Sequence, residues 1–308
     1  MRPLVIALVL LSAAPAAAHA QAAAPDPMAA LRSLLARGAG ATTEFYGSVS
    51  TDLTRSKRLD TGQWLSWQAG MALSGTGKVK LGRSGVIASE HVGKVKIGSR
   101  FLMEEAAPKD PYFAGVLKTE GTLRAVSTDG WQYQLAPKAK SWIRTGKASG
   151  GAAAFGDQFV NVLEPATMRK LLATKSRQSV STWYKDRTTG RKQRIYTLTG
   201  TITLNELARV SPTFREAADT SAPGTSEVTW TYMYDDRGLP YRVGWRFYAH
   251  PRPEVPGLGQ DRILRAHYAT QYRSWEKPMT ITAPRAIPGR GLEVDDLGDV
   301  FSAPQRRR

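Results

Sequence analysis

Hydrophobic positions recur along most of this chain with a period of two, which is typical of β-strands that bury one face. Turn-forming residues separate these segments. The dipeptide Asp129-Gly130 is a strong hairpin signal, and Thr189-Gly190 and Asp236-Arg237-Gly238 mark two further turns. The pattern predicts strands at residues 43–53, 64–81, 86–91, 95–103, 121–127, 131–135, 141–145, 180–185, 194–204, 227–234, 239–248, 263–275 and 279–283.

Two short segments have helical spacing instead. One helix is predicted over residues 28–37, ending at Gly38 and Gly40, and a second over residues 165–174, beginning at Pro165. Many antiparallel strands with few helices indicate a mainly β (α+β) domain over residues 28–288, built on one curved antiparallel sheet or open barrel. The apolar stripes of the two helices are Leu31, Leu34 and Leu35 with Met28, and Met168, Leu171 and Leu172.

Large side chains gather on one face of the C-terminal strands. Within residues 227–234 and 239–248 they alternate with small or polar residues such as Thr229, Thr231, Arg242, Gly244 and Arg246. Helices could cover this apolar face as an ordinary core, or cover it incompletely and leave a cavity for an apolar ligand. The residues on the apolar face are Leu198, Ile202, Leu204, Val228, Trp230, Tyr232, Tyr234, Val243, Trp245 and Phe247.

The N-terminal segment has the pattern of a secretory signal peptide. Arg2 precedes an apolar run, and Ala18-His19-Ala20 fits a cleavage site, so residues 1–20 are predicted to be removed. An Ala/Pro-rich lead follows at residues 21–27, and residues 289–308 are predicted to be a disordered tail. No cysteine is present to carry a lipid anchor. We therefore expect a secreted or extracytoplasmic envelope protein that is not lipid-anchored.

Charge and candidate chemistry narrow the functional classes. The formal net charge of +17 favours anionic partners, namely wall polymers or a membrane surface, whereas nucleic acid is not expected for an exported chain. The histidines His91, His250 and His267 are far apart and lack metal-ligand spacing. No nucleophile or paired-carboxylate motif stands out. The sequence therefore predicts a protein that is not an enzyme, with no catalytic residue, metal or cofactor.

The order of several short segments resembles the exported actinobacterial proteins related to the LppX and LprG lipoproteins, which share the fold of the lipoprotein carrier LolA. The segments are Trp131-Gln132-Tyr133, residues 140–144, residues 161–167 leading to Leu171-Leu172, residues 196–199, residues 234–240 and residues 272–284. The resemblance spans about residues 40–287. It implies an open half-barrel, a single curved antiparallel sheet with a few packed helices and an apolar cavity between sheet and helices.

The resemblance also implies a function. Related proteins carry acylated molecules, so we expect a carrier or sensor of a lipid, lipoglycan or other acylated ligand. The alternative is a basic, wall-associated interaction protein without a lipid ligand, and the sequence indicates no protein partner. The cavity is predicted to be lined by Leu198, Ile202, Val228, Trp230, Tyr232, Val243, Trp245 and Phe247, and plugged by Leu31, Leu34, Leu35, Met168, Leu171 and Leu172.

Overall fold

Strands dominate the chain, as the alternation predicts. The structure, a computed structural model, describes residues 24–53, 67–98, 100–108, 114, 117–148, 159–185, 190, 192–217, 227–249, 264–275 and 277–289. The predicted signal peptide and nearly all of the predicted tail lie outside these residues. The helices are α1 (Pro27–Arg37), α2 (Arg100–Ala106), α4 (Pro165–Ala173), α5 (Leu204–Val210) and α6 (Pro212–Ala217).

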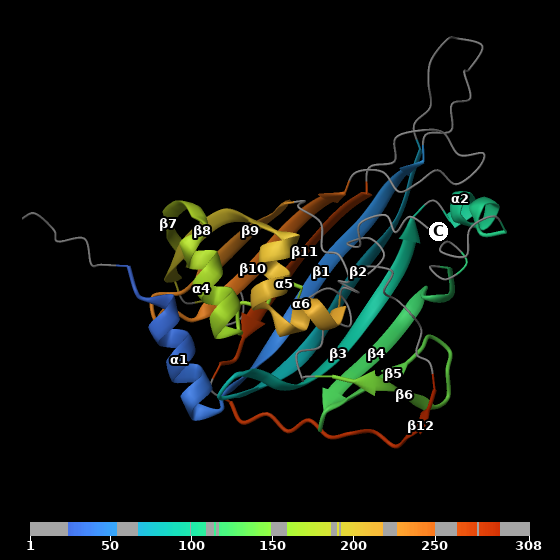
Figure 1. Cartoon of the computed structure of the whole chain (residues 1–308), viewed down its shortest axis with the longest axis horizontal. Helices are drawn as coiled ribbons and strands as arrows, with labels where there is room; N and C mark the ends of the chain where they lie inside the picture. Colours follow the sequence, from blue (N-terminus) through green and yellow to red (C-terminus); the bar gives the residue numbers. More distant parts are fainter. Residues whose placement is uncertain are drawn as a thin grey trace, which may run out of the picture.

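All strands in the described residues belong to one open sheet (Figure 1). The strands are β1 (Gly40–Leu53), β2 (Trp67–Gly82), β3 (Gly85–Gly98), β4 (Gly121–Thr128), β5 (Trp131–Leu135), β6 (Trp142–Lys147), β7 (Lys175–Lys185), β8 (Lys192–Thr203), β9 (Glu227–Tyr234), β10 (Pro240–Ala249), β11 (Leu264–Arg273) and β12 (Ala286–Pro288). Their spatial order is β12-β6-β5-β4-β3-β2-β1-β11-β10-β9-β8-β7. Because β12 and β7 are the two edges, the 12-stranded sheet is not closed.

The predicted antiparallel sheet is correct for every strand pair except one. β12 pairs with β6 in parallel, so the sheet is mixed. The turn at Asp129-Gly130 joins β4 to β5 as predicted, and both of its residues have the positive φ that favours Asp-Gly in a two-residue hairpin. The pairing of β1 with β11 makes the strands of the N-terminal half and those of the C-terminal half parts of one sheet.

Several elements differ from the predictions. β3 runs unbroken from Gly85 to Gly98, and the residues that follow form helix α2 rather than the end of a strand, with Arg100 bonded to Glu104 one turn later. Residues 279–283 are described but do not form a strand. In the described residues after β11, the only strand is β12, which pairs with β6. Helices α5 and α6 are not among the predicted elements, and at α5 the predicted strand runs to residue 204, one residue into the helix.

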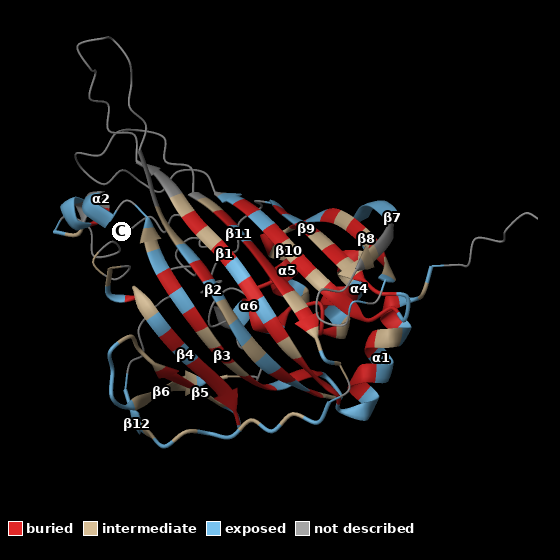
Figure 2. Ribbon diagram, turned by 180° about the vertical axis from the view of Figure 1, so that it is seen from behind, coloured by how far each residue is buried: buried red, intermediate tan, exposed pale blue. Residues whose placement is uncertain are grey.

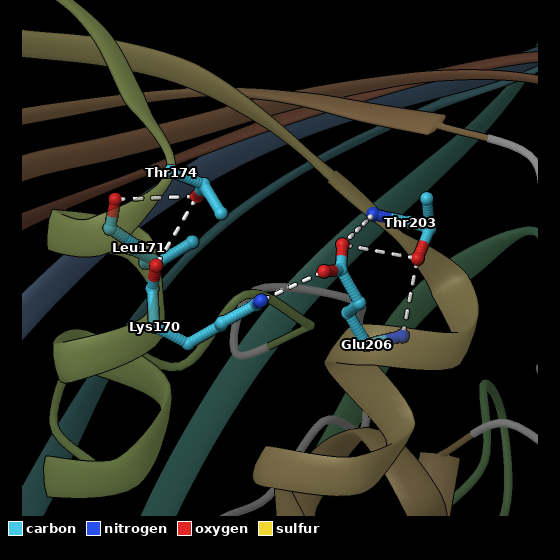
Figure 3. Close-up of polar contacts among 5 residues, drawn as sticks. All are labelled: Lys170, Leu171, Thr174, Thr203 and Glu206. Carbon is cyan, nitrogen blue, oxygen red and sulfur yellow. Dashed lines mark hydrogen bonds and ion pairs between the residues drawn. The ribbon is translucent and has the colours of Figure 1, made fainter.

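The end of β8 is fixed by a capping box that starts α5 (Figure 3). The Thr203 hydroxyl accepts the Glu206 backbone N–H at 3.2 Å, and the Glu206 carboxylate accepts the Thr203 backbone N–H at 3.2 Å. Lys170 of α4 donates to the same carboxylate at 2.7 Å. These bonds lower the pKa of Glu206, and the bond from Lys170 has the largest effect. The Lys170–Glu206 pair also joins α4 to α5.

A buried carboxylate holds α6 against the loop that precedes α4. Glu164 accepts hydrogen bonds from the hydroxyls of Thr167, Ser211 and Thr213 at 2.7, 2.6 and 2.6 Å, and from the Thr213 backbone N–H at 2.9 Å. Its neighbour Asn161 donates to the Thr213 hydroxyl at 3.0 Å. Because a buried carboxylate needs several donors, this network fixes the position of α6.

The helices give the two faces of the sheet different environments. α4, α5 and α6 lie in front of the sheet in Figure 1, and α1 contacts both α4 and β2. The face toward these helices, the covered face, holds the hydrophobic core. The opposite face, the open face, has no helix of this layer packed on it; Figure 2 shows it from behind, with exposed positions alternating with buried ones along the strands.

Candidate functional site

The residues predicted to line an apolar cavity are brought together on the covered face. Each of them is exposed by 2% or less: Leu198, Ile202, Val228, Trp230, Tyr232, Val243, Trp245 and Phe247. Of the predicted plug, Leu31, Leu34 and Leu35 of α1 and Met168 and Leu171 of α4 are buried in the same cluster, and Leu172 is partly buried against it. The structure thus places both sets in one hydrophobic cluster, while the cavity itself stays a prediction.

Aromatic rings pack around Trp245 in the centre of this cluster. Its ring centroid lies 4.4 Å from that of Phe159 and 4.8 Å from that of Tyr268, and Phe159 is in turn 4.6 Å from Phe214 of α6. Such spacings are those of rings in direct contact. Full burial also raises the pKa of the Tyr232 hydroxyl well above its usual value. Around Trp245 the covered face is therefore closely packed.

The open face is basic. Strand register places residues of alternate positions on this face across β1–β4 and β8–β11. The acidic side chains described there, Glu44, Glu90 and Glu227, are fewer than the basic ones. The basic residues are Lys78, Lys80, Lys94, Lys96, Arg124, Arg242, Arg246, Arg265 and Arg273.

Two of the acidic side chains on the open face are already engaged. Glu90 pairs with Lys78 at 3.6 Å and Glu44 with Arg273 at 3.2 Å. Within the described part of the chain, Lys94, Lys96 and Arg246 form no ion pair. The open face therefore keeps a surplus of positive charge that points to solvent.

A pocket of about 360 Å³ lies on the open face at the C-terminal strands. Its floor is a row of register partners, with Thr231 on β9, Gly244 on β10, Ala269 on β11 and Tyr46 on β1. Two small residues between larger ones leave the hollow. The remaining side chains of its rim are Thr229, Met233, Arg242, Arg246 and His267.

Two arginines flank the floor of this pocket. Arg242 and Arg246 are two positions before and after Gly244 on β10, which places each Cα about 7 Å from that of Gly244. Arg242 is half-buried, its guanidinium carbon lies 5.1 Å from the centre of the Tyr46 ring, and burial lowers its pKa. Neither arginine has a carboxylate partner among the described residues.

Hydroxyl and imidazole groups complete the rim. The Ser48 hydroxyl and His267 Nδ1 are 3.0 Å apart, at the edge next to Arg246. Thr229 and Thr231 add two hydroxyls from β9. Cations and hydroxyl donors around a hollow are suited to an anion with several oxygen atoms.

In the described residues, the side chains that could bind a metal ion are scattered. Nowhere do these residues bring together three His, Cys, Asp or Glu side chains that could hold a metal ion. His91 is fully buried on β3 and lies beside Phe45, 5.7 Å between ring centroids, and His250 lies outside the described residues. Within the same part of the chain, every helix is too short or too polar to span a lipid bilayer.

The pocket on the open face was not identified from the sequence. Alternation had separated Arg242, Gly244 and Arg246 from the apolar face without giving them a role. The available signal was their spacing, because two arginines around a glycine at alternate strand positions must share one face. Tyr46 and His267 could not be added to this group from sequence, since the β1–β11 pairing brings Tyr46 there and the β10–β11 pairing brings His267.

Comparisons with known proteins give no family. No family model matches the chain, and no curated protein matches it. A structure described as lipid–protein interactions in lipovitellin is 10% identical, with 87% of this chain and 28% of the lipovitellin chain covered and a TM-score of 0.33. The chain thus spans little more than a quarter of that protein's length. The outer membrane protein OprG from Pseudomonas aeruginosa is 9% identical, with 75% and 93% covered and a TM-score of 0.09. Neither likeness is close enough to carry an inference about the function of this chain.

Proposed function

We propose that this protein binds anionic lipid surfaces through the open face of its sheet. The observation that carries the proposal is the surplus of basic side chains on that face. They extend from Lys94 and Lys96 on β3 to Arg242 and Arg246 on β10. A surface layer of negative phosphates complements such a face over its whole area, as a small anion could not.

Exposed tyrosines on the same face favour a membrane over a wall polymer. Tyr46 is 46% exposed and Tyr248 is 54% exposed, and both occupy open-face positions of their strands. Tyrosine rings are enriched where water meets lipid, because the ring is apolar and the hydroxyl polar. A basic face with interspersed tyrosines suits the headgroup region of a bilayer.

The expected strength follows from the number of charges that approach the membrane together. Each Lys or Arg near an anionic surface contributes about 1 kcal/mol at physiological ionic strength. Four to eight such residues acting together contribute about 4–8 kcal/mol, which corresponds to millimolar to micromolar binding before ordering costs are subtracted. Because the attraction is screened by salt, we expect the binding to weaken steeply as ionic strength rises.

Vesicle co-sedimentation tests this proposal with the full chain. We expect binding to vesicles of phosphatidylcholine with phosphatidylglycerol at low salt, little binding to phosphatidylcholine alone, and release in high salt. A variant with Lys94→Glu and Lys96→Glu should lose most of the binding. Both residues are exposed and unpaired among the described residues, so their replacement should leave the fold intact.

A matched variant tests whether binding depends on charge on the open face or only on the net charge of the protein. Arg169→Glu with Arg209→Glu makes the same change of net charge on exposed positions of α4 and α5, in the helix layer. It should bind anionic vesicles nearly as well as the unmodified protein. Equal loss in both variants, or binding to a soluble anionic polymer without binding to vesicles, would reject the membrane proposal.

A second candidate is a carrier of acylated molecules, with the acyl chain between the sheet and its helices. It is supported by the resemblance to LolA-like proteins and by the single open sheet with a few helices on one face. For this function the rings around Trp245 would have to separate and admit the chain. A fluorescent fatty-acyl probe that competes with lipid extracted from the purified protein would support it, and no binding of the probe would exclude it.

A further inference from the structure

We infer that the pocket around Gly244 is a specific site for a phosphate group, carried by a lipid headgroup or by a small soluble phosphoester. This inference deepens the proposed function and rests on it in one respect, because the pocket opens on the face that would meet the membrane. It adds a defined binding site to a surface that otherwise attracts anions without selection.

The cations of the pocket lack the partner that a phosphate would supply. Arg242 is held half-buried beside Tyr46, and neither it nor Arg246 has a carboxylate among the described residues. A guanidinium that has lost part of its hydration without gaining an anion is less stable in free energy than one in water. Its planar N–H groups match phosphate oxygens two at a time, so a phosphate over Gly244 would offset that loss.

The neutral groups of the rim fit the same ligand. The hydroxyls of Thr229 and Thr231 can each donate to a phosphate oxygen, and the Ser48–His267 pair lies at the Arg246 side. The volume of about 360 Å³ lies within the range of about 300–1,000 Å³ that is usual for small-ligand pockets. A phosphate with a glycerol-sized substituent therefore fits, with Met233 at the rim and the Tyr46 ring on the floor as apolar contacts.

Because Gly244 has no side chain, adding one there tests the site without changing any charge. A Cβ added there would lie 3.5 Å from the Tyr268 carbonyl oxygen and 3.8 Å from the Ala269 Cβ, which are ordinary contacts. Gly244→Val should therefore fold, since valine favours strands, while its methyl groups fill the pocket floor. Thr231→Val is a second variant, which removes one hydroxyl at nearly constant volume.

Calorimetric titration of the full chain with glycerol 3-phosphate at low salt tests the inference. We expect measurable binding, weakened about tenfold or more by Gly244→Val and by Arg242→Gln, and a few-fold by Thr231→Val. The control Lys94→Gln with Lys96→Gln removes charge from the same face outside the pocket and should change this binding less than twofold. Absence of binding, unchanged binding in folded Gly244→Val and Thr231→Val, or equal weakening in the control would overturn the site.

Vesicles distinguish the two sources of phosphate and separate this inference from the proposed function. If the phosphate belongs to a lipid, Gly244→Val should weaken binding to phosphatidic acid vesicles more than binding to phosphatidylglycerol vesicles. If only glycerol 3-phosphate binding responds, the ligand is a soluble phosphoester. Binding of glycerol 3-phosphate without any binding to vesicles would overturn the membrane proposal and leave the phosphate site supported. Binding to vesicles without binding of glycerol 3-phosphate would overturn the phosphate site and leave the membrane proposal supported.

Discussion

The two faces of the β9–β10 hairpin show how one pair of strands serves two purposes. On the covered face, Trp230 and Trp245 are register partners and are almost fully buried. One position along, Thr231 and Gly244 are partners on the open face and line a hollow. The backbone is the same for both pairs, so the difference arises from side chains and from what packs on them.

The two faces differ in what they contribute to stability and to binding. The covered face buries large apolar surface against α4, α5 and α6, and burial of this kind is the main stabilising contribution to a fold. The open face leaves charges in water, where they contribute little to stability but attract ligands over a distance. Substitutions on the two faces should therefore affect different measurements.

The largest effect is expected for Trp245→Ala. Its ring contacts Phe159 and Tyr268, so its removal leaves a cavity in a packed region, and the free energy of unfolding should fall by about 3–5 kcal/mol. Thermal and urea unfolding measure this change, while glycerol 3-phosphate binding should persist in the folded fraction. A small loss of stability, together with altered fatty-acyl probe binding, would instead indicate that the covered face contains the ligand cavity.

The next largest effect is expected for Glu164→Gln. The carboxylate accepts hydrogen bonds from Thr167, Ser211 and Thr213, and an amide cannot accept all of them. Buried hydroxyls left without an acceptor should reduce the free energy of unfolding by about 1–3 kcal/mol. Hydrogen exchange should show the loss in α6 first. Unchanged protection of α6 would mean that apolar packing alone holds the helix layer over the covered face.

A smaller and pH-dependent effect is expected for Glu206→Gln. Lys170 lowers the pKa of Glu206 in the folded protein, so the ion pair stabilises the fold at a pH above the ordinary glutamate value of about 4.3 and is lost as the pH falls through the lower folded value. The variant should lose about 0.5 kcal/mol at neutral pH, and the difference should vanish in acid. A difference that persists at pH 2 would point to the capping bonds of Thr203 instead.

The smallest effect on stability is expected for Arg246→Ala, one residue from Trp245 on the opposite face. Arg246 is exposed and unpaired within the described residues, so the free energy of unfolding should change by about 0.5 kcal/mol or less. Glycerol 3-phosphate binding should weaken several-fold. A loss of stability close to that of Trp245→Ala would contradict the view that the covered face stabilises the fold while the open face binds ligands.

Local patterns predicted most of the fold. Period-two alternation located the strands from β1 to β11, and the turn residues at Asp129-Gly130 set the β4–β5 hairpin. At β8, the predicted strand is too long because the period-two alternation continues past the residue where the strand ends. The Thr203–Glu206 capping box was present in the sequence and ends β8, yet the alternation was extended through it. β12 could not be found, because three residues carry no periodic pattern and their pairing with β6 is long-range.

The sequence by itself determined which side chains of each strand share a face, because successive side chains of a strand point in opposite directions. That was enough to group Trp230 with Tyr232 and Trp245 with Phe247. Only the tertiary structure decided which face the helices cover and which residues of distant strands become neighbours. The β1–β11 pairing brings Tyr46 and Ser48 to Ala269 and His267, more than two hundred residues away along the chain. Such contacts depend on the register between strands, and register is fixed by the burial of the whole covered face rather than by any local pattern.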